Sequence, residues 1–324
     1  MLLSVVVPVF NEEESLPHLY DRTAAVLNEL QTDWQMILVD DGSTDGSREV
    51  IRELHGRDSR VKAVFLSRNF GHEVASTAGL DVAQGDAVIL MDADLQDPPE
   101  TIPELVEKWR EGYEIVSAQR VRRGNASVFR RMTAYLFYRF MNFLVGWELP
   151  RDAGDFRLMD RRAVDAFRQC RERNRFVRAL TVWTGFRQTT VGFERDRRRA
   201  GRTKYNVFRL LELALTSTTS FSVAPLRLAF VVGLSLLLLS LVAIVVIVVQ
   251  KLLGYTAPGY AFLLVSIWFL GGVQCMLIGI VGEYMGRTYV ESQRRPLYIV
   301  RESLGISPSS DPNDKASDSG EATE

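Results

Sequence analysis

The sequence predicts an α/β domain with a doubly wound sheet, followed by a two-helix transmembrane hairpin. Short β-branched runs alternate with helical patterns over residues 1–118, which is typical of parallel strands. Two apolar segments, 228–249 and 261–285, come late in the chain, and each is near the roughly 20 residues that span the apolar core of a bilayer. The formal net charge of -1 gives no overall field that would attract a nucleic acid.

Five runs are expected strands: SVVVPVF, MILVDD, VKAVFLS, DAVILMD and EIVSAQ. Helical patterns lie between them, so we expect parallel pairing with helices on both faces of the sheet. The first run is interrupted by Pro8 and followed at once by polar residues, which favours a buried first strand over a signal peptide. Ligands of such open sheets bind beyond the carboxyl ends of the strands, and the polar motifs of this chain follow those ends.

The second expected strand ends in VDDGSTDGS, residues 39–47. The carboxylates of Asp40 and Asp41 can accept hydrogen bonds from a nucleobase N–H and from ribose hydroxyls. The same residue types are also typical of a turn followed by a helix cap. The motif alone leaves both interpretations open.

The fourth expected strand ends in DADLQDPPE, residues 92–100. Asp92 and Asp94 stand close together, and neighbouring carboxylates repel each other unless a cation binds them. Hard cations such as Mg²⁺ take oxygen ligands, often one or two carboxylates with substrate phosphates, and Gln96 adds an amide oxygen. A solvated acidic loop that caps the next helix is the alternative. The three histidines show no metal-ligand spacing. His72, in NFGHE after a strand, could approach a ligand, but an ordinary surface or loop histidine is favoured.

Residues 127–147 combine a helical apolar period with many aromatic and basic residues. A core-facing helix is the usual explanation of such a period, but this composition favours a helix in the membrane interface. Residues 206–227 are expected to supply a second, juxtamembrane amphipathic helix. Arginines crowd at 120–131 and 195–204, where they suit either phosphate binding or attraction to anionic lipids.

Basic residues flank the predicted hairpin on both sides, whereas its connecting loop carries one lysine. The positive-inside rule then predicts a multi-pass inner- or plasma-membrane protein with both termini and the α/β domain in the cytoplasm. Cys170 and Cys275 are far apart in the chain, so no disulfide framework is expected, in keeping with a reducing compartment. A cytoplasmic segment, 287–306, is expected before a polar, disordered tail over 307–324.

The combination of PVFNEEESL at residues 8–16 with the two acidic motifs resembles glycosyltransferase family 2, whose catalytic domain has the GT-A fold. The hairpin and GDFRLMD at 154–160 narrow the resemblance to the polyprenyl-phosphate glycosyltransferases, which include bactoprenol glucosyltransferase and dolichol-phosphate mannose synthase. The resemblance implies a GT-A catalytic domain over residues 1–205 and two transmembrane helices over 228–286. Only the tail falls outside it.

The resemblance also implies roles for individual residues. Asp94 and Asp155 are the expected catalytic residues, and Mg²⁺ or Mn²⁺ is expected against the donor diphosphate. The expected metal ligands are Asp92, Asp94 and Gln96. The expected nucleotide contacts are Pro8, Phe10, Glu12, Asp40, Asp41 and Asp92. The expected contacts of the acceptor phosphate are Arg122, Arg131, Arg198 and Lys204.

The implied activity is a metal-dependent, inverting transfer of a hexose, most readily glucose from UDP-glucose, to a polyisoprenyl phosphate such as undecaprenyl phosphate. Its product would serve glycan or cell-envelope modification, and the implied partners are the two substrates, membrane lipids and further copies of the chain. Two alternatives are a catalytically inactive membrane scaffold that binds sugar-lipids and a processive polysaccharide synthase. The intact Asp92, Asp94 and Asp155 argue against the scaffold. The chain lacks the Q-x-x-R-W element of processive synthases.

Overall fold

The computed structural model of the protein describes residues 1–120, 153–173, 175, 177–193, 224–253 and 259–306. The chain divides into two compact units, the first of which contains the α/β domain and the second the hairpin. The first unit comprises Met1–Ala126, Leu149–Thr203 and Arg295–Glu324. The second comprises Ser127–Glu148 and Lys204–Arg294.

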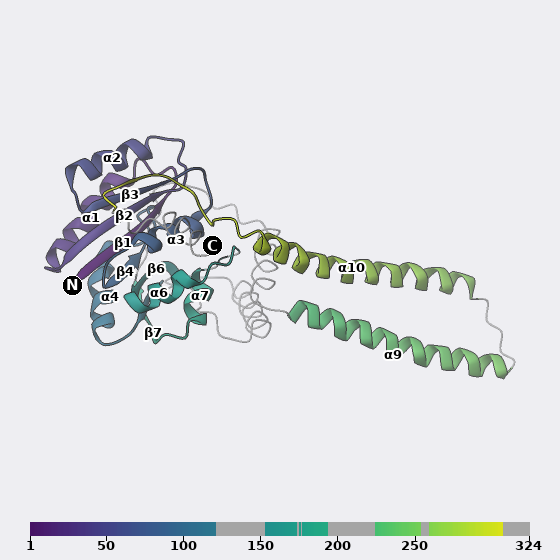
Figure 1. The fold of residues 1–324 in the computed structure, drawn as a ribbon. Helices are drawn as coiled ribbons and strands as arrows, with labels where there is room; N and C mark the ends of the chain where they lie inside the picture. Colours follow the sequence, from purple (N-terminus) through teal and green to yellow (C-terminus); the bar gives the residue numbers. More distant parts are fainter. Residues whose placement is uncertain (121–152, 174, 176, 194–223, 254–258, 307–324) are drawn as a thin grey trace, which may run out of the picture. The chain divides into compact units, whose positions relative to one another are not determined.

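An eight-stranded sheet forms the centre of the first unit (Figure 1). Its strands are β1 Leu2–Val9, β2 Asp33–Asp40, β3 Val61–Leu66, β4 Ala87–Leu90, β5 Ile115–Arg120, β6 Ala153–Asp160, β7 Gln188–Phe193 and β8 Val300–Leu304. Their order in the sheet is β7-β5-β6-β4-β1-β2-β3-β8. β1 to β4 pair in parallel, as does β5 with β7, whereas β6 and β8 are antiparallel to their neighbours.

The predicted α/β sheet is confirmed, and all five predicted strands are present as β1 to β5. The prediction of purely parallel pairing is wrong at one side, because β6 lies between β4 and β5 and runs against both. The motif GDFRLMD forms most of this strand. A strand of opposite direction begins where its neighbour ends, so β6 begins at the carboxyl end of β4.

Helices cover both faces of the sheet (Figure 1). They are α1 Leu16–Glu29, α2 Ser47–Arg57, α3 His72–Val82, η1 Pro99–Thr101, α4 Ile102–Arg110, α6 Arg161–Gln169 and α7 Val177–Trp183. Alternate residues of β1, among them Val5 and Val7, join a core with α1, α2 and α4. Val6 points to the other face, where α3 packs so closely that a Cβ on Gly79 would lie 2.2 Å from the Val6 Cγ1 atom. This close packing fixes the place at which α3 begins.

The segment after the hairpin adds β8 to the edge of the sheet beside β3. The Arg52 guanidinium forms an ion pair with Glu302 at 2.7 Å. The Tyr298 hydroxyl donates a hydrogen bond to the buried Asp81 at 2.7 Å, and Arg171 pairs with the same carboxylate oxygen. The chain beyond the hairpin is therefore an integral part of the α/β domain, which the sequence interpretation did not include.

The second unit contains α9, Ala224–Leu252, and α10, Tyr260–Ser292, which contact each other. Among the described residues, one stretch, Phe269–Ser292, is long and apolar enough to cross a membrane, and none of its apolar window is buried. Helices are thus present over both predicted spans, and their passage through a membrane stays a prediction. Of the predicted interfacial segments, 127–147 and 206–223 lie outside the described residues, as does the predicted tail.

Candidate active site at the carboxyl ends of the strands

The loop after β1 and the turn after β2 are joined by hydrogen bonds. Asn11, which has a φ of 57°, donates its backbone N–H to the Ser43 hydroxyl at 3.0 Å and accepts one from the Thr44 backbone at 2.8 Å. The Glu12 backbone N–H donates to the Ser47 hydroxyl at 2.9 Å. The hydroxyls of VDDGSTDGS therefore hold the PVFNE motif in place at the sheet edge.

The two aspartates that end β2 differ in their surroundings. Asp40 is fully buried and accepts hydrogen bonds from the Ser43 backbone N–H at 3.0 Å and from Arg48 at 2.7 Å. Asp41 accepts hydrogen bonds from the backbone N–H groups of Phe70 and Gly71 at 2.7 and 2.9 Å. Burial raises the pKa of Asp41 above its usual value, although these two bonds act against the shift. Both carboxylates therefore bind neighbouring loops, and the predicted contact of Asp40 with a nucleotide finds no exposed surface here.

The DADLQD loop after β4 is braced by its own side chains. Asp94 accepts hydrogen bonds from both the backbone N–H, at 3.1 Å, and the side-chain amide of Gln96. The Asp92 backbone N–H donates to Asp97 at 3.4 Å. Leu95 has a φ of 60°, a left-handed conformation that is uncommon for a residue with a side chain of this size. These bonds turn the loop so that Asp92 and Asp94 both face the edge of the sheet.

The antiparallel register of β6 places Asp155 opposite Asp92. Leu90 of β4 pairs with Arg157 of β6. Asp92 comes two residues after Leu90 and Asp155 two residues before Arg157, so the antiparallel register sets the two aspartates opposite each other. Asp155 is 14% exposed and lies 3.6 Å from the guanidinium of Arg157, which is 2% exposed and donates to the Thr181 hydroxyl at 2.9 Å. The buried positive charge stabilises a carboxylate that has lost most of its hydration.

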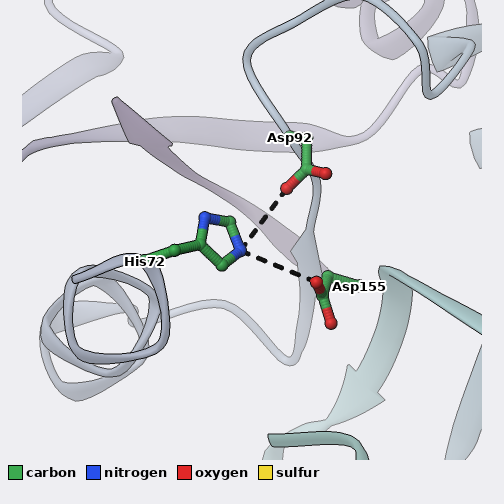
Figure 2. A group of neighbouring side chains, drawn as sticks. All are labelled: His72, Asp92 and Asp155. Atoms are coloured by element: carbon green, nitrogen blue, oxygen red, sulfur yellow. Dashed lines mark ion pairs between the residues drawn. The ribbon is translucent and has the colours of Figure 1, made fainter. Parts of the chain in front are cut away.

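His72, the first residue of α3, points between these two carboxylates (Figure 2). Its Nε2 atom lies 3.5 Å from Asp92 Oδ1 and 3.7 Å from Asp155 Oδ2. One ligand atom from each residue lies within 4.8 Å of the others. The group therefore brings together residues from α3, the loop after β4, and β6. Its first and last members, His72 and Asp155, are more than 80 positions apart in the sequence.

The next residue, Glu73, links α3 to α7. Its carboxylate accepts a hydrogen bond from the backbone N–H of Val177 at 3.0 Å. Burial raises the pKa of Glu73 above its ordinary value, and the negative charge of Asp155 raises it further. The sequence interpretation missed Glu73, because its role depends on a helix more than 100 residues away.

A cavity of about 290 Å³ opens over this group. Its lining residues are Pro8, Phe10, Glu12, His72, Asp92, Ala93, Asp94 and Asp155. An adjoining cavity of about 210 Å³ shares Pro8, Phe10 and His72 and extends to Asp41 and Asn69. A larger one, of about 560 Å³, lies where β1 and β2 begin and contains none of the predicted site residues. Open α/β sheets bind ligands at the other end, which favours the two smaller cavities.

The structure thus brings together most of the predicted site residues that it describes. Pro8, Phe10 and Glu12 from the predicted nucleotide contacts line the same cavity as Asp92, Asp94 and Asp155. Gln96 is 5% exposed and lies behind Asp94. The predicted acceptor-phosphate residues, Arg122, Arg131, Arg198 and Lys204, lie outside the described residues. His72 was judged an ordinary loop histidine, although its place just after a strand end was a usable signal.

An open α/β sheet with carboxylates at the carboxyl ends of its strands is typical of nucleotide-binding proteins. Comparison with known proteins specifies the class: residues 4–168 match Glycosyl transferase family 2, and residues 224–288 match the GtrB C-terminal hairpin. The chain belongs to glycosyltransferase family 2. The hairpin match and the apolar stretch of α10 together suggest membrane association.

Relatives match over nearly the whole chain. The Uncharacterized glycosyltransferase sll0501 of Synechocystis sp. is 46% identical over 305 residues, covering 94% of this chain and 96% of that protein. The Bactoprenol glucosyl transferase of Shigella phage SfV is 42% identical over 303 residues, covering 93% and 98%. Among solved structures, glucosyl-3-phosphoglycerate synthase from Mycobacterium tuberculosis in complex with Mn²⁺ and UDP-glucose is 20% identical, covers 67% of this chain and 78% of that one, and has a TM-score of 0.44.

Proposed function

We propose that this glycosyltransferase moves glucose from UDP-glucose to a polyprenyl phosphate, with the reaction centre in the cavity between Asp92, Asp94 and Asp155. One observation carries the proposal: two carboxylates from β4 and β6 face each other, with a third beside them, at the edge of the sheet where this fold binds ligands. The names of the relatives that match more than nine-tenths of the chain support the sugar and the lipid.

The transfer is a direct displacement. An oxygen of the acceptor phosphate forms a bond to the anomeric carbon of glucose, while the bond from that carbon to the diphosphate breaks and its electron pair leaves with UDP. A phosphate monoester has a second pKa of about 6, so at pH 7 the acceptor is largely a dianion and no base has to remove a proton. Attack from the side opposite UDP inverts the anomeric centre, and an α-linked donor gives a β-linked product.

A divalent cation, Mg²⁺ or Mn²⁺, when bound, supplies positive charge beside the departing diphosphate. The donor set fits such an ion, because Asp92 in the loop after β4 and Asp155 on the neighbouring strand β6 offer carboxylate oxygens, and Asp94 lines the same cavity. Each oxygen of Asp94 accepts one hydrogen bond from Gln96, which orients the carboxylate and leaves it a lone pair for the predicted ligand role.

Other residues of the chain shape the site. Arg157 holds the Asp155 carboxylate from behind, which positions it toward the acceptor phosphate or the sugar hydroxyls. Phe10 is 46% exposed and lines both cavities, where its ring offers an apolar face to the sugar or the base. Because Asp155 has no proton to abstract in this scheme, its task is to orient the reactants or to help hold the cation.

The proposal also concerns the membrane. We propose that α9 and α10 are two spans with both termini in the cytoplasm, because basic residues flank the hairpin, and the composition of the segments 127–147 and 206–227 favours the membrane interface. A reporter enzyme active only outside the cytoplasm, fused within the loop at 254–258, is expected to be active. The same reporter fused at the C-terminus is expected to be inactive. Activity at the C-terminal fusion would contradict this topology.

A transfer assay tests the reaction. Purified full-length protein in detergent is given undecaprenyl phosphate, Mg²⁺ or Mn²⁺, and radiolabelled UDP-glucose, UDP-galactose or GDP-mannose in parallel. We expect label in the lipid from UDP-glucose, with one sugar per lipid and a β linkage. A product with several sugars would instead indicate a processive synthase, and no labelled lipid from any donor would indicate a binding scaffold.

Two variants test the site itself. Asp92→Asn and Asp155→Asn are expected to lower the transfer rate by about 100-fold or more, because each removes a charge from the reacting centre. Glu111→Gln is the matched control, since this carboxylate at the end of α4 is exposed and pairs only with Lys108 among the described contacts. Transfer at the normal rate by either aspartate variant would remove this cavity as the reaction centre.

A further inference from the structure

His72 occupies a fixed position at the edge of the candidate site. It begins α3 directly after Gly71, which has a φ of 100° and therefore a conformation that residues with a side chain rarely adopt. The backbone N–H of Gly71 is held by Asp41 at 2.9 Å. The close packing of α3 on β1 and the hydrogen bond to Asp41 together fix the backbone position of His72.

The distances from the imidazole to the carboxylates are too long for hydrogen bonds. Hydrogen bonds from nitrogen to oxygen are usually about 2.7–3.2 Å long, whereas Nε2 lies 3.5 and 3.7 Å from Asp92 and Asp155. Ligand atoms about 2.1 Å from a common ion lie about 3.0–3.4 Å apart for octahedral or tetrahedral geometry. The His72 nitrogen is therefore spaced from each carboxylate nearly as two ligands of one ion are, and the three ligand atoms all lie within 4.8 Å of one another.

The position of each side chain agrees with this spacing. Asp155 lies on β6 and Asp92 in the loop after β4, its neighbour in the sheet, and His72 approaches from the α3 side (Figure 2). The side chain of His72 is 44% exposed toward the cavity and that of Asp155 is 14% exposed. One side of the group thus stays open, which leaves room for diphosphate oxygens as further ligands.

We propose that Nε2 of His72 is a ligand of the catalytic cation together with Asp92 and Asp155, and that this nitrogen makes the site prefer Mn²⁺ to Mg²⁺. The inference rests on the proposed function and specifies its metal site. Mg²⁺ takes oxygen ligands almost exclusively, whereas imidazole is a common ligand of transition-metal ions. Replacing one oxygen position by nitrogen therefore weakens Mg²⁺ more than Mn²⁺.

The experiment uses Mn²⁺ as its own probe. Full-length protein in detergent is loaded with Mn²⁺ and UDP, without acceptor, and pulsed electron paramagnetic resonance detects nitrogen nuclei bonded to the ion. The chain has three histidines, so ¹⁵N-labelled histidine identifies their signal without ambiguity from the nucleobase. We expect a histidine nitrogen coupling in the wild type and in His18→Gln, the matched control on the exposed side of α1. We expect its loss in His72→Gln.

Competition between the ions gives a second measurement. The Mn²⁺ spectrum reports the free ion, so titration with Mg²⁺ yields the ratio of the two dissociation constants. His72→Gln is expected to lower the preference for Mn²⁺ by about tenfold or more. Even residues that only hydrogen-bond to a metal ligand commonly change metal affinity by about 10- to 100-fold. His18→Gln should leave the ratio unchanged. Because the His72 side chain is largely exposed, both variants are expected to melt at the wild-type temperature.

Several outcomes would overturn the inference. Mn²⁺ bound to the wild type without a histidine coupling would mean that only oxygen atoms hold it. A coupling that persists in His72→Gln would assign the nitrogen to another histidine. In either case normal glucosyl transfer by the wild type would leave the proposed function in place. Failure of the wild type to bind Mn²⁺ in the presence of UDP would overturn both the inference and the metal part of the proposed function.

Discussion

Substitution of Gly42 by alanine tests how the turn after β2 controls the site. Gly42 has a φ of 75°, and a Cβ there would lie 2.6 Å from backbone atoms of both Arg68 and Asn69. Unstrained carbon contacts begin near 3.5 Å, so the loop that leads to His72 must move by about 0.9 Å. Gly112 is the matched control, because its φ is 96° and nothing lies within 4 Å of the added Cβ.

The two variants share the cost of a left-handed alanine, about 1 kcal/mol. Gly42→Ala adds overpacking against backbone that cannot rotate away, which brings its total to about 3 kcal/mol. At about 3 °C per kcal/mol for a domain of this size, we expect the melting temperature to fall by about 3 °C in Gly112→Ala and about 9 °C in Gly42→Ala. Scanning fluorimetry of the purified protein measures both.

The same movement predicts a selective loss of activity. A displacement near 1 Å of a group that positions reactants commonly costs about 100-fold in rate, so Gly42→Ala should lose most of its transferase activity at a temperature where it is fully folded. Gly112→Ala should keep wild-type activity in the same assay. Equal melting temperatures and equal activities of the two variants would refute the argument that the Gly42 turn sets the position of the loop before α3.

Three further predictions concern stability. Arg48→Met leaves the fully buried Asp40 without its charged partner and should lower the free energy of unfolding by about 3 kcal/mol, or about 9 °C in melting temperature. Hydrogen bonds from Arg60 lower the pKa of Asp58 to about 2, so its stabilisation is present above the unfolded value of 3.8 and is lost as the pH falls toward 2. Asp58→Asn should therefore lower the free energy of unfolding at pH 7 by about 1 kcal/mol after allowance for solvent screening, and the difference from wild type should shrink below pH 4. Tyr298→Phe removes one hydrogen bond of about 1 kcal/mol and should speed amide hydrogen exchange in β8, and unchanged exchange there would contradict its role as an anchor.

Local patterns in the sequence were sufficient for the parallel half of the sheet. The runs that became β1 to β4 are β-branched and are separated by helical periods, and the acidic motifs follow β2 and β4. The four strands lie in the order β4-β1-β2-β3 and all run parallel, so their carboxyl ends share one edge of the sheet. The prediction of Asp92 and Asp94 in one cavity followed from that order. The rule that ligands bind at the carboxyl ends of strands needed no further information.

The antiparallel strands could not be predicted from local patterns. β8 follows the hairpin by only a few residues and pairs with β3, more than 230 positions earlier, so nothing near it in the sequence indicates its partner. β6 is inserted between two strands that the chain order makes neighbours. The sequence interpretation did not place His72 beside the carboxylates, because metal-ligand spacing was sought along the chain, whereas Asp92 and Asp155 lie 20 and 83 residues away on other elements.

The motif GDFRL shows how one strand serves the core and the site together. Side chains alternate between the two faces of a strand, so Phe156 and Leu158 point one way while Asp155 and Arg157 point the other. Phe156 joins the core on the α1 side. Its ring packs edge to face against that of Phe193, with the two ring centroids 6.2 Å apart.

On the opposite face of β6, Asp155 approaches His72 of α3, and Arg157 is buried against Thr181 of α7. A slip of one residue in the pairing with β4 would reverse both sets of side chains, placing the aspartate and arginine in an apolar core and two apolar side chains in the cavity. The cost of burying an unpaired charge makes that register untenable. The core residues of β6 therefore fix the position of the carboxylate, and the reacting centre depends on this packing as much as on the DADLQD loop.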